Sequence, residues 1–283
     1  MATLALVLAT AIWGWSFVPV KEATQEMGFL WFLGLRFALA SLLFLPWSPR
    51  RLRDWLQGLG LGVFLFAGYF FQTWGLVYTT VQKSGLITGL STVLVPPMAR
   101  FFGERTPLGT WIGIGIAGSG LVLLVLGGRG PLGAVNIGDL LTVLGAMAYA
   151  LYLVLQGRWL RGGRWQRLLF PQFAAVAVLS SVGAWVQGQI SWALSPRAWE
   201  AVGLTAFLAS GVSFWLLLWA QKRLPTPYTA LILALEPAFA ACFGWWLLGE
   251  RLLGLQLLGA VLIVLGTVWP NIQREGEEEW GGS

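Results

Sequence analysis

The sequence predicts an all-α membrane protein of ten transmembrane helices, arranged as two inverted five-helix repeats with both termini in the cytoplasm. Of its 283 residues, 57% are hydrophobic and 11% are charged, whereas a soluble domain carries about 25% charge. Apolar stretches long enough to cross a bilayer recur along the whole chain, and a short motif recurs at the same place in both halves. Because so few charged residues cannot cover a water-exposed surface, lipid is the expected solvent.

The apolar stretches set the expected helices. A helix needs about 20 mainly apolar residues to cross the ~30 Å hydrocarbon core. Segments of that length lie at residues 3–21, 28–47, 57–78, 84–102, 107–127, 137–157, 167–187, 199–220, 227–248 and 252–270. Proline or glycine marks most of the boundaries between them. A β-barrel would need alternating strands of about 10 residues, and runs such as Leu121–Leu126 do not alternate.

The basic residues favour one orientation in the membrane. The loops that follow even-numbered segments, with their flanks, hold Arg50, Arg51, Arg53, Arg100, Arg105, Arg158, Arg161, Arg164, Arg167, Lys222 and Arg223. The loops that follow odd-numbered segments hold only Lys21, Lys83, Arg129, Arg197 and Arg251. Since Lys and Arg collect in cytoplasmic loops, the even-numbered loops and both termini are expected on the cytoplasmic side.

A three-residue motif divides the chain into repeats. Gly103-Glu104-Arg105 follows the fourth segment and Gly249-Glu250-Arg251 follows the ninth. We therefore expect a first repeat at 1–128 and a second at 135–270, followed by a disordered cytoplasmic tail at 271–283. An odd number of spans gives the two repeats opposite orientations, which is common in secondary transporters. Coincidence of a three-residue match is the alternative.

These features resemble a known family. The motifs that carry the resemblance are Trp13-Gly14, Leu35-Arg36-Phe37, the two Gly-Glu-Arg motifs, and the stretch from Gln72 to Thr80 that continues into Lys83-Ser84-Gly85 and Ile87-Thr88-Gly89-Leu90. From Ala5 to Trp269 the chain is similar to the EamA family of the drug/metabolite transporter superfamily.

The resemblance implies ten helices, secondary transport without a cofactor in the inner membrane, and a central cavity lined mainly by helices one, three, four, six, eight and nine. It also implies a small-molecule substrate, such as an amino acid, another metabolite or a toxic organic compound, usually moved outward. One departure is Glu236-Pro237, where the first repeat has Ser91-Thr92.

The composition excludes several other chemistries. The chain has no histidine, and its single cysteine, Cys242, rules out disulfide frameworks and Cys-rich metal sites. A membrane-embedded enzyme therefore lacks its catalytic parts, and no Walker A sequence is present. The net charge of +6 fits attraction to anionic membrane lipids better than nucleic acid, because the basic residues are scattered between apolar runs.

Two ionisable residues lie deep within expected spans. Arg36 and Glu236 are each about 12–14 Å from the nearer membrane surface, at 1.5 Å per residue. Such groups usually face the bundle interior or a water-filled path. Both are coupling candidates, and Glu236 is also a candidate counter-charge for an amine. A structural salt bridge between them is the alternative. Pro96-Pro97 and Pro237 are expected to interrupt helices four and nine at corresponding depths, a sign of a transporter's binding site, with a static kink as the alternative.

Neutral polar residues at helical spacing complete the candidate site. Residues three apart share a helix face. The substrate-binding candidates are Trp13, Ser16, Tyr69, Gln72, Thr88, Ser91, Tyr149, Tyr152, Ser210, Ser213 and Glu236. The alternative for each pair is a hydrogen bond between helices that only supports packing.

The expected function is secondary transport across the inner membrane, as an exporter of small organic metabolites such as amino acids or amphipathic amines. Access would alternate as one repeat rocks against the other. An importer or exchanger of another metabolite class and a non-transporting assembly subunit remain alternatives. The sequence leaves open the substrate, the direction, proton coupling and the oligomeric state.

Overall fold

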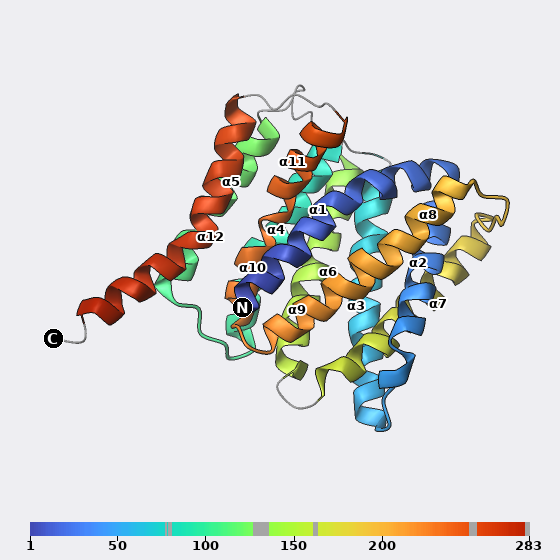
Figure 1. Cartoon of the computed structure of the whole chain (residues 1–283), viewed down its shortest axis with the longest axis horizontal. Helices are drawn as coiled ribbons and strands as arrows, with labels where there is room; N and C mark the ends of the chain where they lie inside the picture. The colour runs from blue at the N-terminus through green and yellow to red at the C-terminus, as the bar shows by residue number, and fades with distance from the viewer. Residues whose placement is uncertain (77, 79–80, 127–135, 161–163, 249–253, 281–283) are drawn as a thin grey trace.

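The computed structural model describes residues 1–76, 78, 81–126, 136–160, 164–248 and 254–280, and every element within these ranges is helical. The elements in chain order are α1 (Ala2–Glu26), α2 (Phe29–Leu43), η1 (Leu45–Trp47), α3 (Leu52–Leu76), α4 (Val81–Phe101), α5 (Leu108–Leu126), α6 (Ile137–Leu160), η2 (Trp165–Leu168), α7 (Leu169–Val186), α8 (Pro196–Leu204), η3 (Thr205–Val212), α9 (Ser213–Gln221), α10 (Thr226–Leu233), α11 (Glu236–Leu248) and α12 (Gly254–Trp280). Figure 1 shows them as one helical bundle.

The helices have the length and composition of membrane spans. In the described ranges, six stretches are long and apolar enough to cross a bilayer: Ala2–Thr24, Leu52–Gly75, Ile137–Leu160, Trp165–Val186, Pro196–Gln221 and Thr226–Leu247. Shorter apolar helices are Phe29–Leu43, Leu108–Leu123 and Leu257–Pro270. The protein is therefore an integral multi-pass membrane protein. All ten expected segments fall largely on helix, and their number of crossings stays a prediction.

Two of the apolar stretches are not simple α-helices. From Pro196 to Gln221, α8, the π-helix η3 and α9 follow one another without a gap. From Thr226 to Leu248, α10 and α11 are separated by a turn at Ala234 and Leu235. The expected interruption at Pro96-Pro97 is wrong, because α4 continues through both prolines. The break near Pro237 does occur, and it makes Glu236 the first residue of α11.

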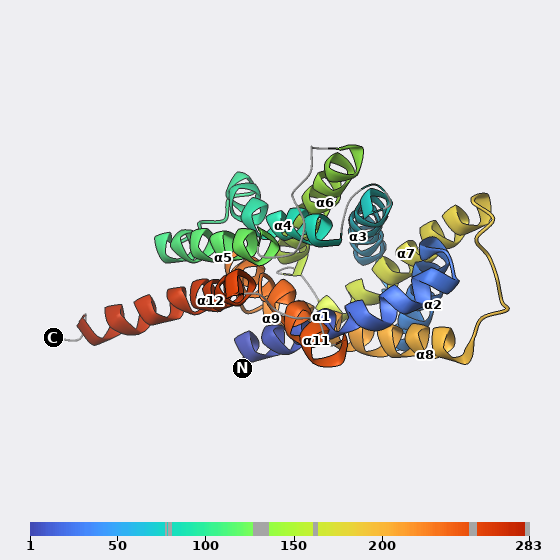
Figure 2. The ribbon, with the colours of Figure 1, turned by 90° about the horizontal axis from the view of Figure 1, so that it is seen from above.

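The packing follows a small set of partners. α5 lies along α12, α3 packs on α6 and α7, α4 packs on α6 and α10, α1 packs on α9 and α11, and α2 packs on α7 and η3. Figure 2 shows α5 and α12 side by side at one edge, and α2, α7 and α8 at the other. A Cβ on Gly113 would lie 2.5 Å from the carbonyl oxygen of Gly266, and the reverse distance is the same. Glycine at both positions therefore lets the backbones of α5 and α12 approach closely.

An aromatic cluster joins three helices in the core. Phe37 of α2 lies 5.3 Å from the Phe173 ring of α7, and Phe173 lies 5.2 Å from the Phe214 ring of α9. All three side chains are buried. Edge-to-face pairs of this kind add stability beyond the area they bury. The cluster fixes the helix turn that carries Arg36.

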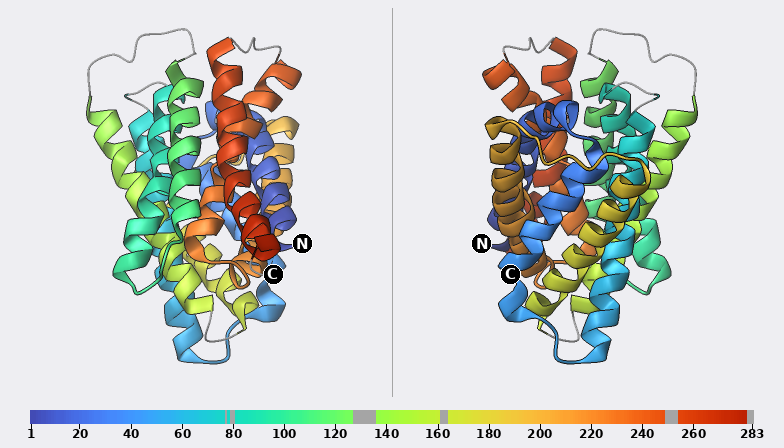
Figure 3. Two further views of the ribbon diagram at one scale, coloured as in Figure 1. Left: turned by 90° about the vertical axis from the view of Figure 1, so that its left-hand side faces the viewer. Right: turned by 90° about the vertical axis from the view of Figure 1, so that its right-hand side faces the viewer.

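Basic residues are concentrated in the connections at one end of the bundle. Figure 3 places the N-terminus, the end of α12 and the connections α2–α3, α4–α5 and α9–α10 at one end. These three connections contain Arg50, Arg51, Arg105, Lys222 and Arg223. We call this end the basic end.

The last helix extends beyond the expected span. α12 runs from Gly254 to Trp280, while the expected repeat boundaries and disordered cytoplasmic tail stay predictions. Gln273, Arg274 and the glutamates from Glu277 have helix propensities close to that of alanine, so the helix continues beyond the apolar stretch.

Candidate functional site

A charged side chain lies in the middle of the bundle. Arg36 of α2 is only 4% exposed, and its Nε donates a hydrogen bond of 2.8 Å to Oγ of Ser210 in η3. Its guanidinium carbon lies 5.8 Å from the centre of the Tyr69 ring of α3. The hydrogen bond and the aromatic face partly replace the water that a buried charge loses.

The polar contacts continue from Tyr69 across three helices. The Tyr69 ring meets the Tyr149 ring of α6 edge-to-face at 5.6 Å. The Tyr149 hydroxyl donates to Oε1 of Gln72 at 3.1 Å, and Nε2 of Gln72 donates to Oγ1 of Thr88 in α4 at 2.9 Å. We call Ser210, Arg36, Tyr69, Tyr149, Gln72 and Thr88 the central network. Tyr69, Gln72, Thr88 and Tyr149 keep partial exposure although they lie between helices.

Glu236 faces this network but is not part of its hydrogen bonds. Its charge acts electrostatically on Tyr69 and Tyr149, and Arg36 acts on Glu236. The side chain is partly exposed. Among the described residues it makes no hydrogen bond and no ion pair within 4.0 Å, so the salt bridge to Arg36 considered above is not formed.

Trp13 lies beside the central network. Its Nε1 donates to the carbonyl oxygen of Ala209 at 2.7 Å, and its ring meets Phe214 edge-to-face at 5.3 Å. The neighbouring Ser16 is buried and donates to the carbonyl oxygen of Trp13 within α1. The indole thus has the partner that a buried N–H requires. Its acceptor comes from the π-helix η3.

Three of the residues chosen by helical spacing make no hydrogen bond to the central network among the described residues. The hydroxyl of Tyr152 is buried and donates to Oε1 of Gln172 in α7 at 3.1 Å, away from Tyr149 and its partner. Ser213 donates to the carbonyl oxygen of Leu208 at 3.1 Å, unlike Ser210, because the wider turn of η3 moves residues three apart off a common face. Ser91 is buried, and nothing in the described structure connects it to the central network.

A second polar group, missed by the sequence reasoning, lies near the basic end. Nε2 of Gln156 in α6 donates to Oε1 of Gln221 at 2.6 Å, and Nε2 of Gln221 donates to the carbonyl oxygen of Leu153 at 2.7 Å. Both glutamines are buried. A glutamine inside an apolar span was the available signal, but it carries no charge and repeats no motif.

The first Gly-Glu-Arg motif lies next to these glutamines. A cavity of about 380 Å³ is lined by Gly103, Glu104, Arg105, Gly157, Gln221, Lys222, Arg223, Leu224, Pro225 and Thr226. Glu104 bonds to Thr226, so the motif joins the α4–α5 connection to α10. The second motif, Gly249-Glu250-Arg251, lies outside the described residues.

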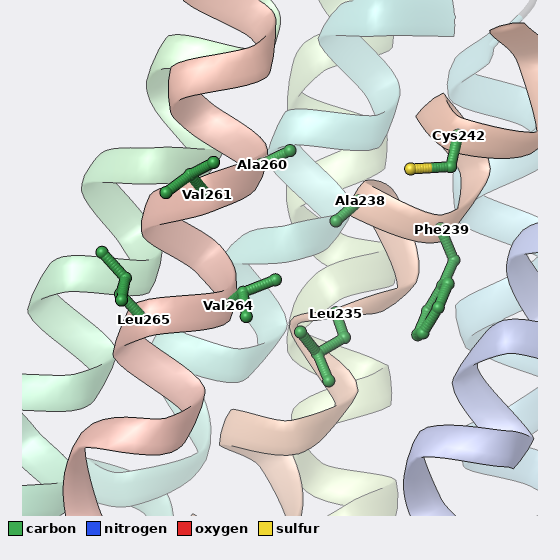
Figure 4. A pocket seen from close by; sticks show the side chains of 8 residues that line it. All are labelled: Leu235, Ala238, Phe239, Cys242, Ala260, Val261, Val264 and Leu265. Carbon is green, nitrogen blue, oxygen red and sulfur yellow. The ribbon is translucent and has the colours of Figure 1, made fainter.

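An apolar groove separates α11 from α12. It has a volume of about 280 Å³ and is lined by Leu235, Ala238, Phe239, Cys242, Ala260, Val261, Val264 and Leu265. Figure 4 shows Ala260 and Val264 of α12 pointing toward α11, and Ala238 and the Cys242 sulfur pointing back toward α12. Apart from the Cys242 sulfur, the lining side chains are hydrocarbon, so the groove differs in chemistry from the central network.

Comparisons with known proteins agree with this architecture. An archaeal "Uncharacterized transporter" of Archaeoglobus fulgidus is 32% identical over 274 residues, covering 94% of this chain and 84% of that protein. A "Probable amino-acid metabolite efflux pump" of Escherichia coli strain K12 is 25% identical over 280 residues, covering 92% and 91%. A solved structure titled "Crystal structure of protein" matches with a TM-score of 0.82 at 20% identity, covering 96% of each chain, and thus shares the fold.

The family comparison matches the chain twice. The sequence model of the EamA-like transporter family matches residues 1–126 and residues 136–271, which together span nearly the whole chain. The family is one of transporters, and these relatives are named as a transporter and an efflux pump. The chain belongs to the EamA-like transporter family.

Proposed function

We propose that this protein is an exporter in the inner membrane that moves small organic metabolites by alternating access through the central network. The observation that carries the proposal is the central network itself. Its hydrogen bonds and ring contacts connect α2, α3, α4, α6 and η3, with Glu236 of α11 facing it. Partly exposed polar side chains deep in a bundle are typical of a substrate path.

The packing supports two inverted repeats of five spans. Exchanging α1 with α6, α2 with α7, α3 with α8–η3–α9, α4 with α10–α11 and α5 with α12 maps the main packing partners onto one another. For example, α1 packs on α9 and α11, and α6 packs on α3 and α4. The two family matches, at 1–126 and 136–271, support the same boundaries. Such a pseudo-twofold arrangement suits a site that opens alternately to each side.

The charge distribution supports cytoplasmic termini. The basic end carries the N-terminus and the Arg-rich connections, and Lys and Arg collect on the cytoplasmic side of multi-pass proteins. The bacterial efflux relative supports placement in the inner membrane. Glu236 and Arg36 are the candidates for coupling transport to an ion gradient.

The name of the Escherichia coli relative supports export of amino-acid metabolites as the first candidate activity. The test is flux in proteoliposomes that contain the purified protein, preloaded with each common L-amino acid in turn or with small amphipathic amines. Outward flux above that of empty liposomes, reduced by replacing Gln72 or Tyr149 with Ala, is the expected result. Absence of flux for every compound, in a protein that remains folded, would leave the non-transporting subunit as the better description. Flux only in the inward direction would favour the importer.

A further inference from the structure

We propose that Arg36 and Glu236 act as a pair that recognises both charges of a zwitterionic α-amino acid: the guanidinium binds the ligand's carboxylate, and the Glu236 carboxylate binds its ammonium group. The inference rests on the proposed function and narrows its substrate class. It makes these two residues the specificity determinants of the central site and excludes amines without a carboxylate.

Arg36 is held in place but lacks a counter-ion. Its Nε is occupied by Ser210, and the Phe37 and Tyr69 rings lie 5.3 Å and 5.8 Å from the guanidinium carbon. Among the described residues no carboxylate lies within 4.0 Å of its nitrogens. The Tyr69 hydroxyl also interacts with this guanidinium. A positioned guanidinium without a carboxylate partner is well suited to bind a ligand's carboxylate through charge-assisted hydrogen bonds.

Glu236 is the complementary half. It opens α11 directly after the turn at Ala234 and Leu235, and α11 packs on α1. Its carboxylate has no hydrogen-bond or ion-pair partner among the described residues and keeps partial exposure. A carboxylate that is accessible in the interior and lacks a fixed partner can accept hydrogen bonds from an ammonium group.

Glu236 lies one turn before Phe239 and Ala240, which closely approach Gly14 of α1. The adjacent Trp13 bonds to Ala209, next to the Ser210 partner of Arg36, so both charges lie around the same part of α1, and no ion pair within 4.0 Å joins them. Burying each of these charges costs free energy, and no opposite charge in direct contact offsets that cost. A ligand with one charge would pair with only one of the two residues and leave the other charge unpaired. A zwitterion compensates both at once, and its side chain then meets the aromatic surroundings formed by Trp13, Tyr69 and Tyr149.

The test compares three ligands on one scaffold. The common L-amino acids are first ranked by thermal shift of the detergent-purified protein, since a ligand that binds the folded state raises its apparent stability. The strongest binder is then compared with its carboxamide, which lacks the negative charge, and with its 2-hydroxy acid, which lacks the ammonium group. The amino acid is expected to bind about tenfold to a hundredfold more tightly than either analogue.

Two variants test which residue binds the ammonium group of the ligand and which binds its carboxylate. In Glu236→Gln, the amino acid and the hydroxy acid should bind equally, while the preference over the carboxamide remains. In Arg36→Gln, the amino acid and the carboxamide should bind equally. Because each comparison is made within one variant, a general loss of stability does not imitate it. If Arg36→Gln does not fold, Arg36→Lys should keep a weakened preference for the carboxylate.

Glu200→Gln is the matched control, because Glu200 is exposed on α8 and its loss should leave all three ratios unchanged. A wild-type protein that binds the carboxamide as tightly as the amino acid would overturn the inference. So would variants that lower the affinity for all three ligands equally. If proteoliposomes export amines but no amino acid, the proposed exporter stands and this inference fails. If they transport nothing, both fail.

Discussion

Glu104 and Thr226 hold together two connections that are far apart in the sequence. Oε1 of Glu104 accepts a hydrogen bond of 3.1 Å from the Thr226 hydroxyl, and Oε2 accepts one of 3.4 Å from the Thr226 backbone N–H. Thr226 is the first residue of α10, so the carboxylate lies at the positive end of that helix. This contact joins the two halves of the chain at the basic end.

Replacing Glu104 with Ala should destabilise the protein by about 0.5–2 kcal/mol, as losing the cap of a helix does. Thr226→Val should give a similar loss, and the double variant should lose less than the sum of the two because both remove one contact. Thermal unfolding in detergent measures these effects, with Glu200→Ala on exposed α8 as control. Fully additive losses would contradict the contact.

Gly14 lies where α1 approaches α11. A Cβ at this position would lie 2.6 Å from the Phe239 Cβ and 2.8 Å from the Ala240 backbone nitrogen. Gly14→Ala should therefore destabilise the protein by about 1–3 kcal/mol through overpacking. Gly115→Ala in α5 is the control, since nothing lies within 4 Å of its Cβ position. The control should be neutral or slightly stabilising, and equal losses in thermal unfolding for both variants would disprove the close approach.

The buried glutamine pair near the basic end can be tested by a double-mutant cycle. Gln221→Leu should cost about 1–3 kcal/mol, because it leaves the Gln156 amide without its acceptor in a buried place. Replacing both glutamines with leucine should recover part of that loss, since no amide then stays unpaired. Free energies of unfolding for the two single variants and the double variant give the coupling. If the double variant is at least as unstable as the sum of the single variants, the hydrogen bond has no such role.

Glu26 at the end of α1 should make stability depend on acid pH. The Ser195 hydroxyl, and then the Ser195 backbone N–H, hold the pKa of this carboxyl below its ordinary value of 4.5. A lowered pKa in the folded state means that the contribution to stability is fully present above pH 4.5 and is lost as the pH falls through the folded value.

Glu26→Gln removes this dependence. The variant should melt below the wild type at neutral pH, and the difference should shrink toward zero in strong acid. Melting curves recorded at several pH values check this. A difference that does not change with pH would show that the charge of Glu26 plays no part in the contact with Ser195.

The sequence was sufficient for the positions of the helices, because span length, Pro and Gly breaks and apolar composition are local properties. It was insufficient for side-chain partners. Tyr149 and Tyr152 are three residues apart, yet one bonds to Gln72 of α3 and the other to Gln172 of α7. Which partner each tyrosine bonds to depends on the rotation of α6 about its axis, and that rotation is set by the packing of all its neighbouring helices. Pro96-Pro97 was also wrong as a helix break, because α4 continues through both prolines.

The eight residues of η3 change the number of residues per turn in the helix from Pro196 to Gln221. A π-helix carries more residues per turn than an α-helix, so every side chain after Val212 is rotated about the axis relative to a continuous α-helix. An alignment that treats Pro196–Gln221 as one uniform helix will assign Phe214 and Trp215 to the wrong sides when it is extended from α8. Deleting one residue in η3 would turn α9 by about 100° and carry the Phe214 ring out of its place between Phe37 and Phe173.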